Sequence, residues 1–465
     1  MADANRVQVS TLEEKTWGTT NAAVGSITVN QADVAVGDTS VTISGGAALT
    51  VGDTFTVAGD TQVYIVKTDT SNTVVAFSPA AKVAWANTAA ITTNNFVELP
   101  ITGGSMSESP DTVRSSQLRS DAQLADMKRT GGEPTAAFDF EMQADNMDNI
   151  LRAALRNSPA NTWSNFAITA TTISATASDK SLNDSGSGFS TSIPKGSWIY
   201  VSGFTGDTSN NGWKQVSKTT APTAAKIIVE QTLVDDGATE SVTITSSEIR
   251  NGSDLTSFSL QMANLDIAST FRLITGARIT DFGLNISSQS IIPGNVVFSG
   301  KRMTRPTSAS GAGSVTPAAD VDVMSEVTAF DGFWIGGSEI TTYEMVSASL
   351  NISTTARPQV GLGNLQKVGM NLGPIDVTGS VEFYLESANY ATLQDYLLGF
   401  TSFEFAFALS DGTNRYFFHM PQVKLTSEPG TVGGIDTDMM LSFDFAADPA
   451  DIGGVTKTIQ VSRVS

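Results

Sequence analysis

The sequence predicts a mainly β (α+β) protein with two tandem β-sandwich or barrel domains, each with one packed helix, plus two small all-β inserted modules. Charged residues make up only 16% of the chain, below the usual quarter. Thr, Val, Ser and Gly recur instead in short runs typical of strands. A second observation is a repeat, because FDFEMQADNMDNILRAAL at 138–155 has the same apolar pattern as VEFYLESANYATLQDYLL at 381–398. The chain therefore contains one structural unit twice.

The repeated unit predicts a strand, a turn and a helix. Apolar residues alternate at 138, 140 and 142 and again at 381, 383 and 385, which indicates half-buried strands. Apolar residues then follow at helical spacing in both copies. Asp145 and Ser387 are the expected helix N-caps, and Gly399 is expected to end the second helix. We therefore expect one helix packed on the strands of each domain.

The spacing of the repeat changes after the helix, which indicates an insertion. Residues 112–155 match 355–398 at an offset of 243, whereas SFSLQMA at 257–263 matches SFEFAFA at 402–408 at an offset of 145. The connection between helix and next strand is a few residues long in the second copy and thus about a hundred residues longer in the first. This predicts a domain inserted at a surface turn, where insertions are tolerated. Residues 306–320, PTSASGAGSVTPAAD, have no periodicity and indicate a linker.

These patterns divide the chain into segments. Both inserts contain a glycine turn, at Gly52 and Gly196, that leads into an alternating strand, so both are predicted to be small all-β modules. The predicted segments are an N-terminal arm at 1–21, a β module at 22–93, the two parts of the first domain at 94–163 and 251–305, a second β module at 164–250, a linker at 306–324 and the second domain at 325–465.

Charge and composition exclude several classes of function. Asp and Glu outnumber Lys and Arg 47 to 27, for a net charge of −20, whereas a nucleic-acid-binding surface needs cations. The chain has no Cys, a single His at 419 and no GxSxG motif. We therefore expect no enzyme, no metal site and no cofactor. No signal-peptide pattern and no membrane-length apolar run is present, which predicts a soluble protein assembled in a cytoplasm.

A further set of segments carries a family resemblance. These segments are EEKTWGTT at 13–20, FVELPITGGSMSESPDTVRSSQLRSD at 96–121, ADMKRTGGEPTAAFDFEM at 125–142 and ILRAAL at 150–155. In this order they resemble the tail tube (major tail) proteins of long flexible-tailed bacteriophages. The insert segment GSWIYVSGF, followed by NNGWKQV, resembles an accessory module often carried by that family. The second copy matches the general pattern but lacks the RSD signature of residues 119–121.

The resemblance implies a structural protein of the virion tail. Family members form six-fold rings that stack into a hollow tube through which the genome passes. Two tube domains in one chain then predict a homotrimer with pseudo-six-fold symmetry. The expected partners are further copies of the chain, a tape measure protein in the lumen before ejection, the tail terminator, and baseplate or tip proteins, with no membrane. The lumen is expected to carry acidic or neutral polar groups, because cations facing it would trap the phosphates of passing double-stranded DNA.

The long polar segment 105–135 is the expected ring-to-ring contact. Its mixed charges suit pairing with a neighbouring ring, and the alternative is a solvated loop without a partner. The candidate residues are Arg114, Arg119, Asp121, Asp126, Lys128 and Arg129.

Three other functions fit the chain less well. A β-repeat surface adhesin would agree with the Thr- and Ser-rich, cysteine-free composition, but it predicts an export signal and an exposed aromatic face. A tail sheath or baseplate subunit is a closer alternative, although a sheath needs a different and larger body. An acidic extracellular hydrolase is disfavoured, because no catalytic constellation is recognisable.

Overall fold

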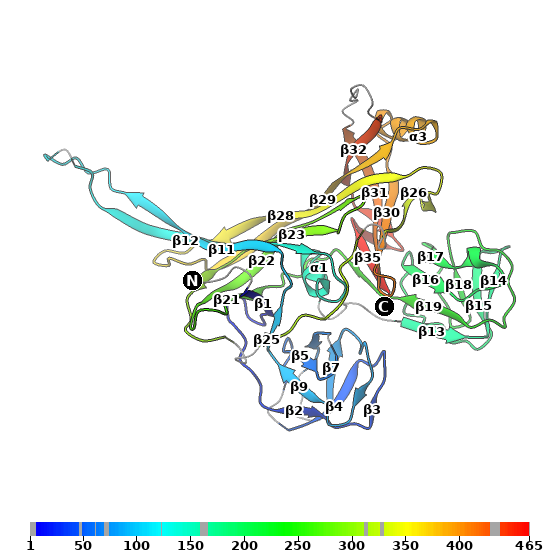
Figure 1. Cartoon of the computed structure of the whole chain (residues 1–465), viewed down its shortest axis with the longest axis horizontal. Helices are drawn as coiled ribbons and strands as arrows, with labels where there is room; N and C mark the ends of the chain where they lie inside the picture. The colour runs from blue at the N-terminus through cyan, green and yellow to red at the C-terminus, as the bar shows by residue number, and fades with distance from the viewer. Residues whose placement is uncertain are drawn as a thin grey trace.

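The computed structural model shows a mainly β protein with two described α-helices (Figure 1), so the predicted fold class is confirmed. The structure describes residues 6–45, 49–60, 62–68, 74–121, 123–158, 166–310, 315–325, 330–427 and 438–464. Parts of the predicted arm, of both modules, of the linker and of the second domain lie outside these ranges. No described helix is both long and apolar enough to cross a bilayer.

Two bodies of similar build form the centre of the molecule. The first body comprises β1 (Val7–Glu13), β11 (Gly103–Arg114), β12 (Met127–Glu141), α1 (Asp148–Ala154), β21 (Phe258–Asn264), β22 (Phe271–Ser287), β23 (Pro293–Ser299) and β24 (Arg302–Thr304). The second body comprises β26 (Phe330–Ile335), β28 (Met345–Gln359), β29 (Gly369–Tyr384), α3 (Ser387–Leu398), β30 (Phe403–Ser410), β31 (Arg415–Ser427), β32 (Met440–Ala447) and β35 (Gln460–Val464).

The two bodies share their strand pairings, all antiparallel. In the first body β22 pairs with β21, β23 and β24, β12 pairs with β11 and β23, and β1 pairs with β21. In the second body β31 pairs with β30, β32 and β35, β29 pairs with β28 and β32, and β26 pairs with β30. The sequence repeat therefore coincides with a repeat of topology that includes β1, a strand within the predicted N-terminal arm.

One strand pair joins the bodies into a continuous sheet. Residues 281–287 of β22 run antiparallel to residues 347–353 of β28. Through this pair the strands follow one another in the order β11–β12–β23–β22–β28–β29–β32–β31. Alternation along each strand points one set of side chains, such as Phe140, Phe282 and Val381, into an apolar core that spans both bodies. The opposite set faces away from that core.

The first inserted region contains a closed barrel. Its strands are β2 (Ile27–Val29), β4 (Ser40–Ser44), β7 (Val74–Ser78), β6 (Tyr64–Val66), β5 (Thr54–Val57) and β9 (Ala90–Thr93), beside the pair β3 (Asp33–Val34) and β8 (Trp85–Ala86). Gly52 has a φ of +85° in the turn before β5, a conformation that suits glycine. Phe55, Tyr64, Phe77 and Trp85 fill the interior. This barrel has its own core and hangs below the bodies in Figure 1.

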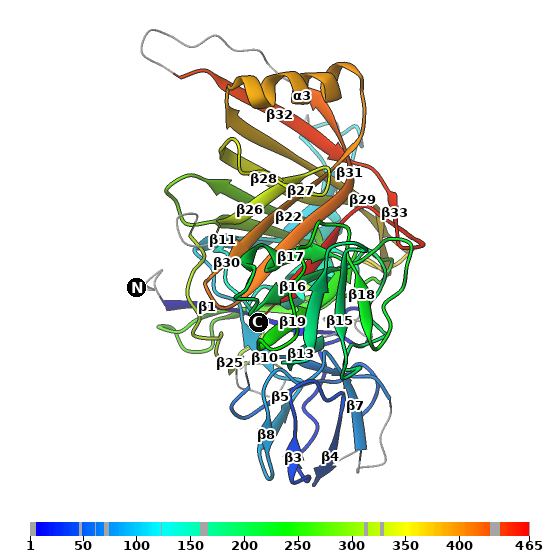
Figure 2. The same cartoon turned by 90° about the vertical axis from the view of Figure 1, so that its right-hand side faces the viewer.

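The second inserted region has a different arrangement. One sheet contains β13 (Phe166–Ala170), β19 (Val242–Ser246), β16 (Trp198–Ser202) and β17 (Gly212–Gln215). Another contains β14 (Ile173–Thr176), β15 (Ser181–Asp184) and β18 (Lys226–Ile228). Strand β20 (Glu248–Arg250) then returns the chain to the second body by pairing with β35. Figure 2 shows these sheets in front of the second body, with the barrel of the first insert below.

Short strands complete the described structure. They are β10 (Phe96–Glu98) and β25 (Val315–Thr316), which pair in parallel, β27 (Ser338–Glu339) beside β26, and the hairpin of β33 (Ala450–Ile452) and β34 (Val455–Lys457). Strand β25 lies within the predicted linker segment.

The helix ends differ from the expected caps. The prediction of Asp145 as N-cap was wrong, because α1 begins at Asp148 after Met147, and Asp145 has a φ of +63° in the preceding turn. In α3 the N-cap is Glu386 rather than Ser387, and Glu386 forms a reciprocal capping box with Asn389. The expected end of this helix at Gly399 is confirmed.

Candidate assembly surfaces

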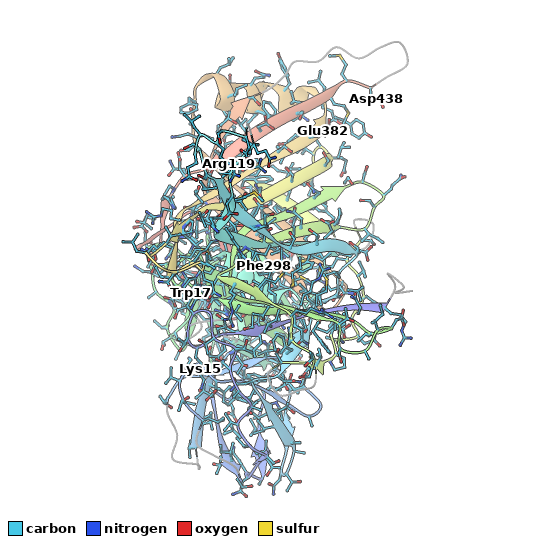
Figure 3. All side chains as sticks on the ribbon, turned by 90° about the vertical axis from the view of Figure 1, so that its left-hand side faces the viewer. Lys15, Trp17, Arg119, Phe298, Glu382 and Asp438 are labelled. Atoms are coloured by element: carbon cyan, nitrogen blue, oxygen red, sulfur yellow. The ribbon has the colours of Figure 1, made fainter. Side chains whose placement is uncertain are left out.

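The face of the continuous sheet opposite the core is polar and mainly acidic. Directly opposed residues of neighbouring strands share a face, and one such row runs Asp139, Asn295, Gly283, Asn351 and Thr378. The acidic residues of this polar face include Glu133, Asp139, Glu141, Asp281, Asp376, Glu382 and Asp444, and Arg278 stands on it opposite Ser299. Lys424 of β31 stands opposite Ala446 on the same face, and its ammonium group pairs with Asp448 at 2.9 Å. Negative charge therefore dominates the surface, on which Figure 3 labels Glu382.

The β11–β12 hairpin projects far beyond the first body (Figure 1) and carries all six predicted contact residues. Arg119 and Asp121 form two hydrogen bonds at 3.0 and 2.7 Å, and this contact lowers the pKa of the Asp121 carboxyl. Lys128 pairs with its neighbour Asp126. Figure 3 shows Arg119 at the projecting end of this hairpin.

The other two predicted residues lie on the strands of the hairpin. Arg129 pairs with Glu108 across the ladder, and exposed Arg114 stands opposite Met127. The structure thus brings the six residues onto one hairpin, where five of them make pairs within the chain. It does not gather them into a single cluster.

The hairpin ends also expose large apolar side chains, a feature that the charge pattern did not predict. In the first body these residues are Val113, Leu118, Leu124 and Met127, and Leu118 is fully exposed. The β28–β29 hairpin of the second body exposes Val360, Leu362, Leu365 and Val368, with Leu362 fully exposed. Gathered apolar side chains on a projecting surface mark a site of protein contact. The signal available in the sequence was the presence of Leu and Val inside polar turn segments.

In the continuous sheet, one edge of β11 and part of one edge of β31 have no strand paired to them among the described residues. Strand β11 pairs with β12 along one edge only, whereas its counterpart β28 is paired on both edges, with β29 and β22. Likewise β22 pairs first with β21 and then with β28 along one edge, but β31 pairs only with β30 there, as far as Val423. The described residues after Val423, at 424–427, leave that edge of β31 open. Open edges of this kind are ready to pair with another chain.

A buried ionic cluster holds helix α1 against the second body. Arg463 of β35 pairs with Asp148 and, at 2.7 Å, with Asp145. The hydroxyl of Tyr416 donates to Asp148 at 2.5 Å, and Lys82 of the first insert also pairs with Asp145. Burial raises the pKa of the Asp148 carboxyl to about 6, although Arg463 opposes the shift. Sequence reasoning missed this cluster because Arg463 and Asp148 are 315 positions apart.

The second insert docks on the second body through aromatic residues. Trp198 and Trp213 pack on Phe417, with ring centroids 4.2 and 4.8 Å apart, and Trp334 completes the cluster. Lys218 of the insert pairs with Glu404. Burial lowers the pKa of nearby His419 to about 3, so this single histidine is neutral at pH 7. The cluster fixes the insert on the side of the second body that faces away from the polar face.

Together these features define a duplicated β-protein with an acidic sheet face, open edges and exposed apolar tips, which is the build of an assembling structural subunit. The model of one protein family, described as phage tail tube protein, matches residues 4–447, and the chain belongs to that family. No curated protein matches the chain. The protein is thus a structural subunit of a bacteriophage tail tube, located in the virion tail, where it assembles with itself and with other tail components.

Proposed function

We propose that three chains close into a ring of six similar bodies, and that these rings stack into the channel through which viral DNA is ejected. The observation that carries the proposal is the shared topology of the two bodies, together with the open edges of β11 and β31. One chain supplies two consecutive wall segments, formed by residues 94–163 with 251–305 and by residues 325–465, with a linker at 306–324, an arm at 1–21 and inserted β modules at 22–93 and 164–250. Closed cyclic symmetry leaves no open edge within a ring.

The junction inside the chain is the template for the junction between chains. Within the chain, residues 281–287 of β22 pair with 347–353 of β28. Gly103 pairs with Asp139 as Ser347 pairs with Glu382, which places residues 103–109 of β11 at the position of 347–353. Ser427, on the open edge of β31, pairs with Asp444 as Asp281 pairs with Val297, so it occupies the place where the paired part of β22 begins. Ring closure therefore pairs the open edge of β31 with β11 of the next chain.

The polar face lines the channel in this arrangement. Each body contributes carboxylates, such as Asp139 and Asp376, at a spacing set by the strand ladder. These fixed negative charges repel phosphates, so double-stranded DNA passes without being held. Before ejection the same face surrounds the tape measure protein. Assembly in the host cytoplasm, with the tail terminator and the baseplate or tip proteins at the two ends, completes the proposal.

Stacking of rings uses the projecting hairpins. The apolar tips, including Leu118 and Leu362, become buried against the neighbouring ring. The charged residues proposed for the contact, Arg114, Arg119, Asp121, Asp126, Lys128 and Arg129, surround the apolar tip of the β11–β12 hairpin and add selectivity for the matching surface. No specific observation favours the alternative of a surface adhesin.

Electron microscopy of the purified protein tests the ring. The expected images show rings with a central hole and six near-equal densities around it, with the inserts as unequal protrusions outside. Dispersed single chains at every concentration, or rings with a different number of wall densities, would overturn the proposal.

A further inference from the structure

We propose that the exposed apolar face of helix α3 docks on the β21–β22 turn of a neighbouring copy of this chain. The inference rests on the proposed ring and adds the side chains that hold one chain to the next. It follows from comparing α3 with α1, whose surroundings within the chain show what the equivalent helix contacts.

Equivalent positions of the two helices differ sharply in exposure. The two helices end in the same way, because Arg156 and Phe400, each one residue after the C-cap, both have a positive φ. The C-caps therefore align Ala154 with Leu398 and Arg156 with Phe400. Ala154 and Arg156 are buried, whereas Leu398 is 81% exposed and Phe400 is 61% exposed. Tyr390, on the same helix, is 50% exposed. The second helix therefore presents an uncovered apolar face at positions that the first helix buries.

The cover of α1 comes from a defined part of the second body. Tyr416, near the start of β31, donates to Asp148, and Arg463 of the paired strand β35 also contacts Asp148. Tyr416 and Val461 of these strands belong to the same apolar core as Met147 and Leu155. The helix of one body is thus covered by the start of the β31-type strand of the following body.

The first body presents the matching surface for α3. Ala263 pairs with Phe271 as Ala408 pairs with Phe417, so Thr270, just before β22, occupies the position of Tyr416. The turn that leads to it exposes Leu265 and Ile267, which are 54% and 44% exposed. Within one chain Arg6 pairs with Asp266 of this turn, but neither described helix lies on it as α1 lies beside Tyr416. In a ring, the turn of the next chain reaches α3.

The chemistry changes on both sides of the junction together. The aligned helix C-caps place Thr392 at the position of Asp148, so the carboxylate that Arg463 contacts is absent. On the opposing strand Thr270 stands at the position of Tyr416, so the phenol that donates to Asp148 is absent as well. A buried carboxylate without its partner is costly, and here both members are lost. The pattern is that of an ionic junction within the chain and an uncharged junction between chains, which commits the face to a second copy of this chain as occupant.

Cysteine cross-linking tests the contact directly, since the chain contains no Cys. The variant Leu398→Cys with Ile267→Cys is assembled into rings and treated with a short bifunctional maleimide. The expected product is a covalent ladder that ends at the closed ring. The control is Thr413→Cys with Ile267→Cys, because exposed Thr413 lies in the β30–β31 turn of the second body and not on α3. This control is expected to give no ladder.

A charge at the same position supplies a second measurement. Leu398→Glu is expected to weaken assembly about tenfold or more, because burying an unpaired carboxylate is unfavourable. Its thermal unfolding as a single chain stays unchanged, since the side chain is exposed there. Thr413→Glu, at an exposed turn position away from α3, serves as the control and assembles normally.

The outcomes separate the two proposals. Rings that form normally with Leu398→Glu, or that give no ladder from the Leu398 and Ile267 pair, overturn the α3 contact and leave the ring standing. Cross-links from the Thr413 control equal to those from Leu398 also overturn the contact. Absence of rings from the unmodified protein overturns the ring itself.

Discussion

Helices α1 and α3 occupy the same place in two bodies of the same topology, but their environments are opposite. Helix α1 buries Asp148, Arg152 and Leu155, whereas α3 leaves Tyr390 and Leu398 in solvent. Strand pairing alone therefore does not determine how much of a helix is buried. The burial depends on what packs against the helix, because α1 contacts the second body of its own chain and α3 has no described neighbour at the equivalent surface.

The largest expected effect comes from breaking the ionic cluster beside α1. Arg463→Met leaves the carboxylates of Asp145 and Asp148 without their buried cation and is expected to lower the free energy of unfolding by about 3–5 kcal/mol. Denaturant unfolding of the unassembled chain measures the change. The control is Arg6→Met, which removes an exposed pair with Asp266 and is expected to cost about 1 kcal/mol or less. Equal losses in the two variants would contradict the account.

A truncation near the end of each helix sharpens the comparison. Leu155→Ala removes a fully buried side chain and is expected to cost about 2–5 kcal/mol of unfolding free energy. Leu398→Ala, in the last turn of α3, is expected to change it by about 0.5 kcal/mol or less. Chemical denaturation of both unassembled variants gives the difference. A larger loss at Leu398 than at Leu155 would mean that the environments are assigned the wrong way round.

The carboxyl of Asp148 gives the cluster a pH dependence. Its pKa is raised in the folded chain to about 6, so its contribution to stability is fully present below its ordinary pKa and is lost as pH rises through about 6. Relative to Asp148→Asn, the unfolding free energy of the unmodified chain is expected to fall by about 2 kcal/mol between pH 4 and pH 7. Arg463, Asp145, Tyr416 and Lys82 surround the group in both proteins. A difference that grows with pH would refute the sign.

The smallest effect on stability is expected at the hairpin tips. The double variant Leu118→Asp, Leu124→Asp changes exposed side chains, so the unfolding free energy is expected to shift by about 0.5 kcal/mol or less. Stacking of rings is nevertheless expected to fail, because the charged tip cannot be buried without a partner. Electron microscopy distinguishes single rings from tubes. Ser116→Asp in the same tip is the control and is expected to form tubes. Tubes of normal length from the Leu118 and Leu124 variant would contradict the role of the tip in stacking.

Local patterns in the sequence predicted much of the fold. Alternation at Phe138, Phe140 and their counterparts predicts strands because a half-buried strand has a period of two, and β12 and β29 lie there. The change of offset from 243 to 145 marks the second insert without any structural information. Helix caps were less predictable, since Glu386 and Asn389 cap each other through a reciprocal bond that several residue pairs could make.

Long-range features of the assembly surfaces could not be predicted in the same way. Arg463 meets Asp148 only because β35 returns beside β31, and no local pattern encodes that approach. The charged residues of the β11–β12 hairpin were found because charge is visible in a sequence. The exposure of Leu118 and Leu362 was not found, because an apolar residue in a turn is as often buried as exposed until its neighbours are known.

The mass of a single ring tests the central claim most directly, that one chain supplies two equivalent wall segments. Native mass measurement of rings released from short tubes is expected to give three chains of 48.7 kDa each. A ring of six chains would contradict the account, because each chain would then contribute only one body to the wall.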